Sequence, residues 1–155
     1  MAKTRILVVD DDTNLLDLML MRLEASGYDV TAIDHENRAR EAAAREIFDV
    51  AVVDLQLVKQ DGLLLMDELH SMQPEMPVII LTAHGSIENA VEAMERGAFT
   101  YLTKPFDSRE LILQIERATE RNKLTGEINR LAKGHYFSPI LLRLQQILFR
   151  LPAAR

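Results

Sequence analysis

The stretch ILVVDDD at residues 6–12 decides the fold, because it joins a short apolar run directly to three aspartates. Three further apolar runs end in a polar residue: residues 50–53 (VAVV) precede Asp54, residues 78–81 (VIIL) precede Thr82, and residues 99–102 (FTYL) precede Thr103 and Lys104. Short β-branched runs of this kind are typical of buried strands. Ligands of an open parallel sheet bind beyond the carboxyl ends of its strands, so these four endings are expected to meet at one point.

Strand-like runs and helix-length segments alternate along the first part of the chain. The runs begin near residues 5, 29, 50, 78 and 99, and a segment long enough for a helix follows each. This alternation predicts an α/β fold with right-handed crossovers and helices on both faces of the sheet. We expect a five-stranded parallel sheet of order 2-1-3-4-5, which is the flavodoxin-like arrangement, with a helical C-terminal extension.

Capping residues and helical spacing predict the bounds and the buried faces of the helices. The expected starts and ends are Asp12 or Thr13 to Gly27, residues 36–46, residues 62–72, Ser86 to Gly97, and a last helix capped by Ser108. The spacing of apolar residues assigns Leu18 to the buried face of the first helix, together with Leu15, Leu16, Met19 and Leu23. In the fourth helix it assigns Val91 and Met94 to the buried face, beside Ile87 and Ala90.

The length of 155 residues and a hydrophobic content of 48% suit one domain with an appendage. We expect a domain over residues 1–122, followed over residues 123–155 by a helical linker and an amphipathic helix rich in leucine and isoleucine. The absence of cysteine excludes disulfides and thiolate metal sites. No signal peptide and no membrane-spanning run are recognisable, so a cytoplasmic protein without a membrane partner is expected.

Charge is divided unevenly along the chain. Residues 1–120 contain 11 basic and 23 acidic residues, whereas residues 121–155 contain 7 basic residues and one acidic residue, Glu127. An acidic body repels a phosphate backbone, so direct contact with nucleic acid is not expected of this chain. Neither a GxxxxGK[ST] loop nor a helix-turn-helix follows the first domain, which gives no basis for ATP or DNA activity.

The polar strand endings suggest phosphoryl chemistry at a metal site. Carboxylates brought close together repel one another, and a hard divalent cation such as Mg²⁺, or alternatively Mn²⁺, relieves that repulsion. Asp10, Asp11 and Asp54 are the expected carboxylates. A carboxylate can itself attack a phosphoryl group and form an acyl phosphate. Lys104 would neutralise the phosphoryl oxygens, and the hydroxyl of Thr82 would donate a hydrogen bond to one of them.

These motifs resemble the receiver domains of two-component response regulators over about residues 4–122. The acidic pair after the first strand, the lone Asp54, Thr82-Ala83 and Lys104-Pro105-Phe106 occur in the order of that family. The sequences around residues 66–70 and 82–106 are most similar to receivers of the nitrogen-regulator class, which usually continue into an ATPase that activates the alternative sigma factor. The resemblance implies that a sensor histidine kinase phosphorylates the domain and that a surface of the fourth helix and fifth strand then controls an output, expected to be transcription.

The resemblance also implies a role for each site residue. Asp54 would be the phosphoacceptor, Asp11 a direct Mg²⁺ ligand, Asp10 a ligand through water, and Gln56 a ligand through its backbone carbonyl. Thr82 and Tyr101 would form the switch pair. Lys104 would pair with the phosphate, and the Lys104-Pro105 bond would be cis. Gln56 and His84 occupy positions that tune hydrolysis of the acyl phosphate in the family.

Other functions remain open at this point. A phosphatase of the haloacid-dehalogenase type also forms an aspartyl phosphate, but it needs a second aspartate where this chain has Gln56. A flavodoxin-like flavin binder would have to hold a phosphate beside three aspartates, and a pseudo-receiver would only bind partners. The stripe of Leu124, Ile128 and Leu131 resembles a coiled-coil linker. We therefore expect a homodimer, through the fourth helix and fifth strand or through the C-terminal helices.

Overall fold

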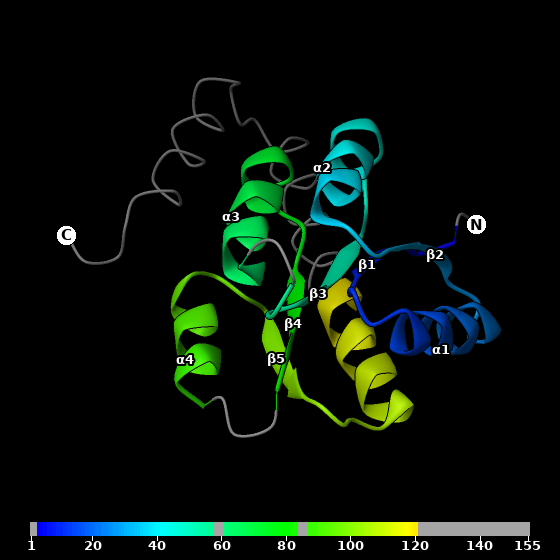
Figure 1. Cartoon of the computed structure of the whole chain (residues 1–155). Helices are drawn as coiled ribbons and strands as arrows, with labels where there is room; N and C mark the ends of the chain where they lie inside the picture. Colours follow the sequence, from blue (N-terminus) through cyan, green and yellow to red (C-terminus); the bar gives the residue numbers. More distant parts are fainter. Residues whose placement is uncertain (1–2, 58–60, 84–86, 121–155) are drawn as a thin grey trace, which may run out of the picture. The chain divides into compact units, whose positions relative to one another are not determined.

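A computed structural model describes residues 3–57, 61–83 and 87–120. Strands and helices alternate through this part of the chain: β1 (Arg5–Val9), α1 (Thr13–Ala25), β2 (Asp29–Ile33), α2 (Glu36–Arg45), β3 (Val50–Asp54), α3 (Gly62–Met72), β4 (Val78–Thr82), α4 (Ile87–Glu95), β5 (Thr100–Thr103) and a helix over residues 108–120. All strand pairs are parallel, and the sheet order is β2-β1-β3-β4-β5 (Figure 1). The predicted fold class and strand order are confirmed.

Two apolar clusters cover the two faces of the sheet. Alternate strand residues such as Leu7 and Val53 pack with α2 and α3 on one face. The intervening residues, such as Val8 and Val52, pack with α1 and the helix over residues 108–120 on the other (Figure 1). The central strands β3 and β4 are buried along their whole length, as expected for strands covered on both sides. The sheet therefore gives the carboxyl ends of its strands a rigid frame.

Three side-chain assignments from helical spacing are wrong. Leu18 is 41% exposed, because Leu16, Met19 and Leu23 already form the buried face of α1 and Leu18 points away from it. Val91 and Met94 are 52% and 42% exposed. Among the α4 residues whose burial the structure describes, Ala90 is buried as predicted, and Ala93 is buried beside it.

The predicted helix caps are correct at one helix and shifted at another. Asp12 caps α1, since its Oδ1 accepts a hydrogen bond from the N–H of Leu15 at 3.2 Å, and Gly27 follows the helix with a φ of 93°. The last helix is capped by Asp107 rather than Ser108. The Asp107 carboxylate accepts from the N–H of Arg109 at 2.9 Å. Aspartate and serine are both good caps, so adjacent candidates could not be separated by residue type. The predicted cap Ser86 lies outside the described residues.

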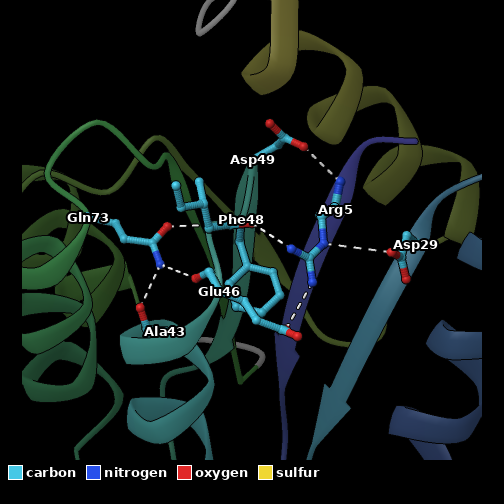
Figure 2. Close-up of polar contacts among 8 residues, drawn as sticks. Arg5, Asp29, Ala43, Glu46, Phe48, Asp49 and Gln73 are labelled. Carbon is cyan, nitrogen blue, oxygen red and sulfur yellow. Dashed lines mark hydrogen bonds and ion pairs between the residues drawn. The ribbon is translucent and has the colours of Figure 1, made fainter. Parts of the chain in front are cut away.

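Gln73 lies beside the turn that leads into the amino-terminal end of β3 (Figure 2). The polar site residues follow the carboxyl ends of the strands, at the opposite end of the sheet. The Nε2 of Gln73 donates hydrogen bonds to the carbonyl oxygens of Ala43 and Glu46, at 2.9 and 2.7 Å, and its Oε1 accepts from the N–H of Phe48 at 3.1 Å. One side-chain amide thus joins the end of α3 to the turn between α2 and β3.

Arg5, the first residue of β1, makes several contacts at the same end of the sheet (Figure 2). Its guanidinium forms ion pairs with Glu46 at 3.0 Å and Asp29 at 3.7 Å, and it lies 5.4 Å from the centre of the Phe48 ring. Its backbone N–H donates to Asp49 at 2.8 Å. These contacts and those of Gln73 stabilise the amino-terminal end of the sheet, which lies away from the candidate site.

The chain divides into two units, residues 1–122 and residues 123–155. The predictions for residues 123–155, a linker helix and an amphipathic helix, lie outside the described residues. Within the described ranges, none of the helices has the length and apolar character needed to cross a bilayer.

Candidate functional site

The pairing of β1 with β3 brings the aspartates together. Val9 pairs with Val53, so the residues that follow them, Asp10 and Asp54, lie next to each other at the carboxyl ends of β1 and β3. One carboxylate oxygen from each of Asp10, Asp11 and Asp54 can be chosen so that the three lie within 4.8 Å of one another. Asp10 is fully buried, Asp54 is 5% exposed and Asp11 is half-buried. Three oxygen ligands at this spacing, partly open to solvent, fit a hard cation such as Mg²⁺.

The third aspartate of the run has a different role. Asp12 caps α1, and its backbone N–H donates to Oδ1 of Asp10 at 2.9 Å. The ILVVDDD stretch therefore places two carboxylates at the cluster and uses the third to start a helix.

Lys104 brings a positive charge to both buried carboxylates. Its Nζ lies 2.9 Å from Oδ2 of Asp10 and 3.3 Å from Oδ2 of Asp54. Its backbone N–H donates to the carbonyl oxygen of Thr82 at 2.7 Å, which ties the end of β5 to the end of β4. The Lys104-Pro105 peptide bond is cis, as the resemblance implied.

The electrostatics of Asp54 follow from these neighbours. Burial, and then the charge of Asp10, raise the pKa of Asp54 to about 6, although Lys104 and the N–H of Gln56 act in the opposite direction. Gln56 donates that N–H to Oδ1 of Asp54 at 3.2 Å. Burial alone would lower the pKa of Lys104, but its hydrogen bond to Asp10 and the charges of Asp10 and Asp54 more than offset this, and the pKa is raised. Lys104 is therefore protonated and available to an anion at this site.

Thr82 and Tyr101 come from β4 and β5, which lie on the opposite side of β3 from β1. Thr82 ends β4, is 2% exposed, and its hydroxyl donates to the carbonyl oxygen of Leu102 at 3.5 Å. Tyr101, on β5, is 42% exposed in this conformation. His84 lies outside the described residues.

Sequence reasoning treated Gly62 only as the first residue of a helix and missed its position at the site. Gly62 lies against the backbone of Asp54 and Leu55, where a Cβ atom would be 2.2 Å from the carbonyl oxygen of Asp54. Its N–H donates to the carbonyl oxygen of Leu55 at 2.8 Å. The only signal was a glycine at a helix start, where its conformational freedom has no evident use.

Comparison with known proteins gives this arrangement a family. Residues 6–116 match the family model of the response regulator receiver domain, and the chain belongs to that family. It is 40% identical over 139 residues to the transcriptional regulatory protein GlrR of Escherichia coli (strain K12), a match that covers 90% of this chain and 31% of GlrR. The chain thus spans less than a third of the length of the curated transcriptional regulators that it matches.

Solved structures agree with the fold and the family. The receiver domain of NtrX from Brucella abortus is 38% identical, with a TM-score of 0.72, and the match covers 74% of this chain and 98% of that domain. A CheY-like receiver domain protein from Methanospirillum hungatei JF-1 is 31% identical, with a TM-score of 0.76, covering 80% of this chain and 99% of the other. The predicted resemblance to receivers, including those of the nitrogen-regulator class, is confirmed.

Proposed function

We propose that this domain is a phosphorylation switch in which Asp54 accepts a phosphoryl group from a histidine of a sensor kinase. The observation that carries the proposal is the cluster of Asp10, Asp11 and Asp54 with Lys104 at the carboxyl ends of the central strands. Two buried carboxylates and a half-buried one suit a divalent cation, and the lysine suits the extra negative charge of a phosphoryl group.

The group transfer needs only the phosphohistidine, Asp54 and a proton from solvent. A carboxylate oxygen of ionised Asp54 forms a bond to phosphorus as the P–N bond to the kinase imidazole breaks, and the released imidazole nitrogen takes up a proton from water. Lys104, 3.3 Å from Asp54, neutralises charge on the transferred oxygens. The hydroxyl of Thr82, now on the carbonyl of Leu102, supplies a donor to the product if it rotates toward it.

Asp11, Asp10, Asp54 and the backbone carbonyl of Gln56 are the residues that would hold Mg²⁺, with Mn²⁺ as an alternative. The bound cation supplies charge neutralisation for the attacking carboxylate and the phosphoryl oxygens. It also offsets the repulsion that, with burial, raises the pKa of Asp54.

The proposed output surface is formed by α4 and β5. Val91, Met94 and Tyr101 are all more than 40% exposed there. Movement of Thr82 toward the phosphate and inward rotation of Tyr101 would change this surface, because a charge of about −2 on one side chain can bias a two-state element. We propose that the change controls homodimerisation, through α4 and β5 or through residues 123–155, and thereby transcription by an output domain, as in a cytoplasmic regulator of the sigma-factor-activator class.

Incubation with acetyl phosphate, followed by intact-mass measurement, tests the proposal. We expect one phosphoryl adduct that requires Mg²⁺, is absent in Asp54→Asn and persists in the control Asp29→Asn, whose side chain lies at the opposite sheet edge. An adduct of equal yield in Asp54→Asn would contradict it. Release of many equivalents of phosphate from a phosphomonoester would indicate a phosphatase instead, which the glutamine at position 56 does not favour. Absence of any adduct would contradict the proposal and favour a pseudo-receiver that only binds partners.

A further inference from the structure

Gly62 meets the end of β3 more closely than a residue with a side chain could. A Cβ atom at this position would lie 2.2 Å from the carbonyl oxygen of Asp54, 2.7 Å from Cα of Leu55 and 2.8 Å from the carbonyl oxygen of Leu55. All three are backbone atoms, which cannot rotate away as the tip of a side chain can. Alanine here would require α3 to move away from the sheet or the backbone of Asp54 to move.

The need for glycine is a matter of space and not of backbone conformation. Gly62 is the first helical residue of α3, and its φ lies outside the left-handed region. Gly27 is the opposite case: its φ is 93°, and nothing lies within 4 Å of a Cβ built there. The chain thus offers two glycines that alanine would disturb for different reasons.

The close approach of Gly62 is accompanied by backbone contacts that hold residues 55 and 56 in place. The N–H of Gly62 donates to the carbonyl oxygen of Leu55 at 2.8 Å, and Gln56 forms an isolated antiparallel bridge with Asp61. The N–H of Gln56 in turn donates to Asp54 at 3.2 Å. The backbone between Asp54 and Gln56 is therefore held from one side by β4, through the bond from Leu55 to Leu81, and from the other by Gly62.

We infer that Gly62 is a positioning residue for the cation site, because its missing side chain lets the start of α3 set the place of the Asp54 carboxylate and the Gln56 backbone together. This inference rests on the proposed function, which assigns both groups to Mg²⁺. Residues that orient metal ligands without touching the metal typically change metal affinity by about 10–100-fold when they are replaced.

Calorimetric titration of Mg²⁺ into the full chain tests the inference, with urea unfolding of each variant measured in parallel. Gly62→Ala is expected to weaken Mg²⁺ binding by about 10–100-fold. Gly27→Ala is the control, because it adds backbone strain far from the site. It should lower the urea midpoint and leave the Mg²⁺ Kd within about twofold of wild type.

The outcomes separate this inference from the proposed function. If wild type binds Mg²⁺ and Gly62→Ala binds it equally well, the role of Gly62 alone is overturned. Equal weakening of Mg²⁺ binding in Gly27→Ala would overturn it too. Absence of Mg²⁺ binding in wild type would overturn both. If Gly62→Ala does not fold, hydrogen exchange of the wild-type amides decides: Mg²⁺ should slow exchange at Gly62 and not at Gly27, and no slowing at Gly62 would overturn the inference.

Discussion

The Nζ atom of Lys104 lies 2.9 Å from Oδ2 of Asp10, although 94 residues separate the two in the chain. Asp10 has no exposed surface, and its second oxygen is taken by the N–H of Asp12. The ion pair therefore compensates a buried charge when no cation is bound. Lys104 Nζ also lies 3.3 Å from Oδ2 of Asp54, so the same ammonium contacts both buried carboxylates of the cluster, including the proposed phosphoacceptor.

Replacement of Lys104 by methionine is expected to destabilise the metal-free protein. The change leaves the buried Asp10 carboxylate without its counter-charge, at a cost of about 1–3 kcal/mol, since Lys104 is itself partly exposed. Urea unfolding in EDTA measures this loss. Saturating Mg²⁺ should restore more stability to Lys104→Met than it adds to wild type, and an equal gain in both would argue against the shared cluster.

The stability of the metal-free protein should depend on pH through Asp54. Its pKa is about 6 in the folded state against 3.8 as the ordinary value, so between these values the folded state binds more protons than the unfolded state. Stability from this group is present below about pH 4 and is lost as pH rises through about 6. In EDTA and above pH 7, the free energy of unfolding of Asp54→Asn should therefore be about 1–3 kcal/mol larger than that of wild type.

That advantage of Asp54→Asn should shrink toward zero at about pH 4 and reverse in Mg²⁺, because the cation binds wild type more tightly. Urea unfolding at several pH values gives both results. A difference that does not change with pH would mean that burial and the charge of Asp10 do not act on Asp54 as described.

The neighbouring aspartates 11 and 12 should give opposite phenotypes. Asp12→Ala removes the cap of α1 and should cost about 1 kcal/mol of stability with little effect on the Mg²⁺ Kd. Asp11→Ala should lower Mg²⁺ affinity by at least about tenfold with little loss of stability in EDTA. Calorimetric titration and urea unfolding on the same samples make the comparison. Equal effects of both variants on Mg²⁺ binding would contradict the separate roles.

Gln73 should matter for stability and not for the site. Gln73→Glu can still accept from Phe48 but cannot donate to Ala43 or Glu46, so it should lower the free energy of unfolding by about 1–3 kcal/mol. Thermal unfolding followed by circular dichroism checks this. The Mg²⁺ Kd should not change, because Gln73 lies at the opposite edge of the sheet. A variant as stable as wild type would show that the amide bridge contributes nothing.

The strand ends were predictable because each combines a buried apolar run with a polar residue, and both the strand order and the cluster of Asp10, Asp11 and Asp54 follow from parallel pairing. Helix faces were less predictable. Hydrophobicity correctly assigned Ala90 to the buried side of α4, but it also chose the larger Val91 and Met94, whereas the small Ala93 is buried there.

Tertiary contacts account for the rest. The sequence placed Lys104 at the site but not against Asp10 in particular, and the position of Gly62 against Asp54 depends on how α3 packs on the end of β3. Asp107 in place of Ser108 as a helix cap is a smaller case, in which two adjacent residues had equal propensity.

The most direct measurement of the central claim is the chemical identity of the phosphorylated residue. Borohydride reduces an aspartyl phosphate to homoserine, so treatment with acetyl phosphate and Mg²⁺, reduction and peptide sequencing by mass spectrometry locate the modified position. We predict homoserine at position 54, present with Mg²⁺ and absent in EDTA. Homoserine at position 10 or 11, or no homoserine in protein that carries a phosphoryl adduct, would contradict the account.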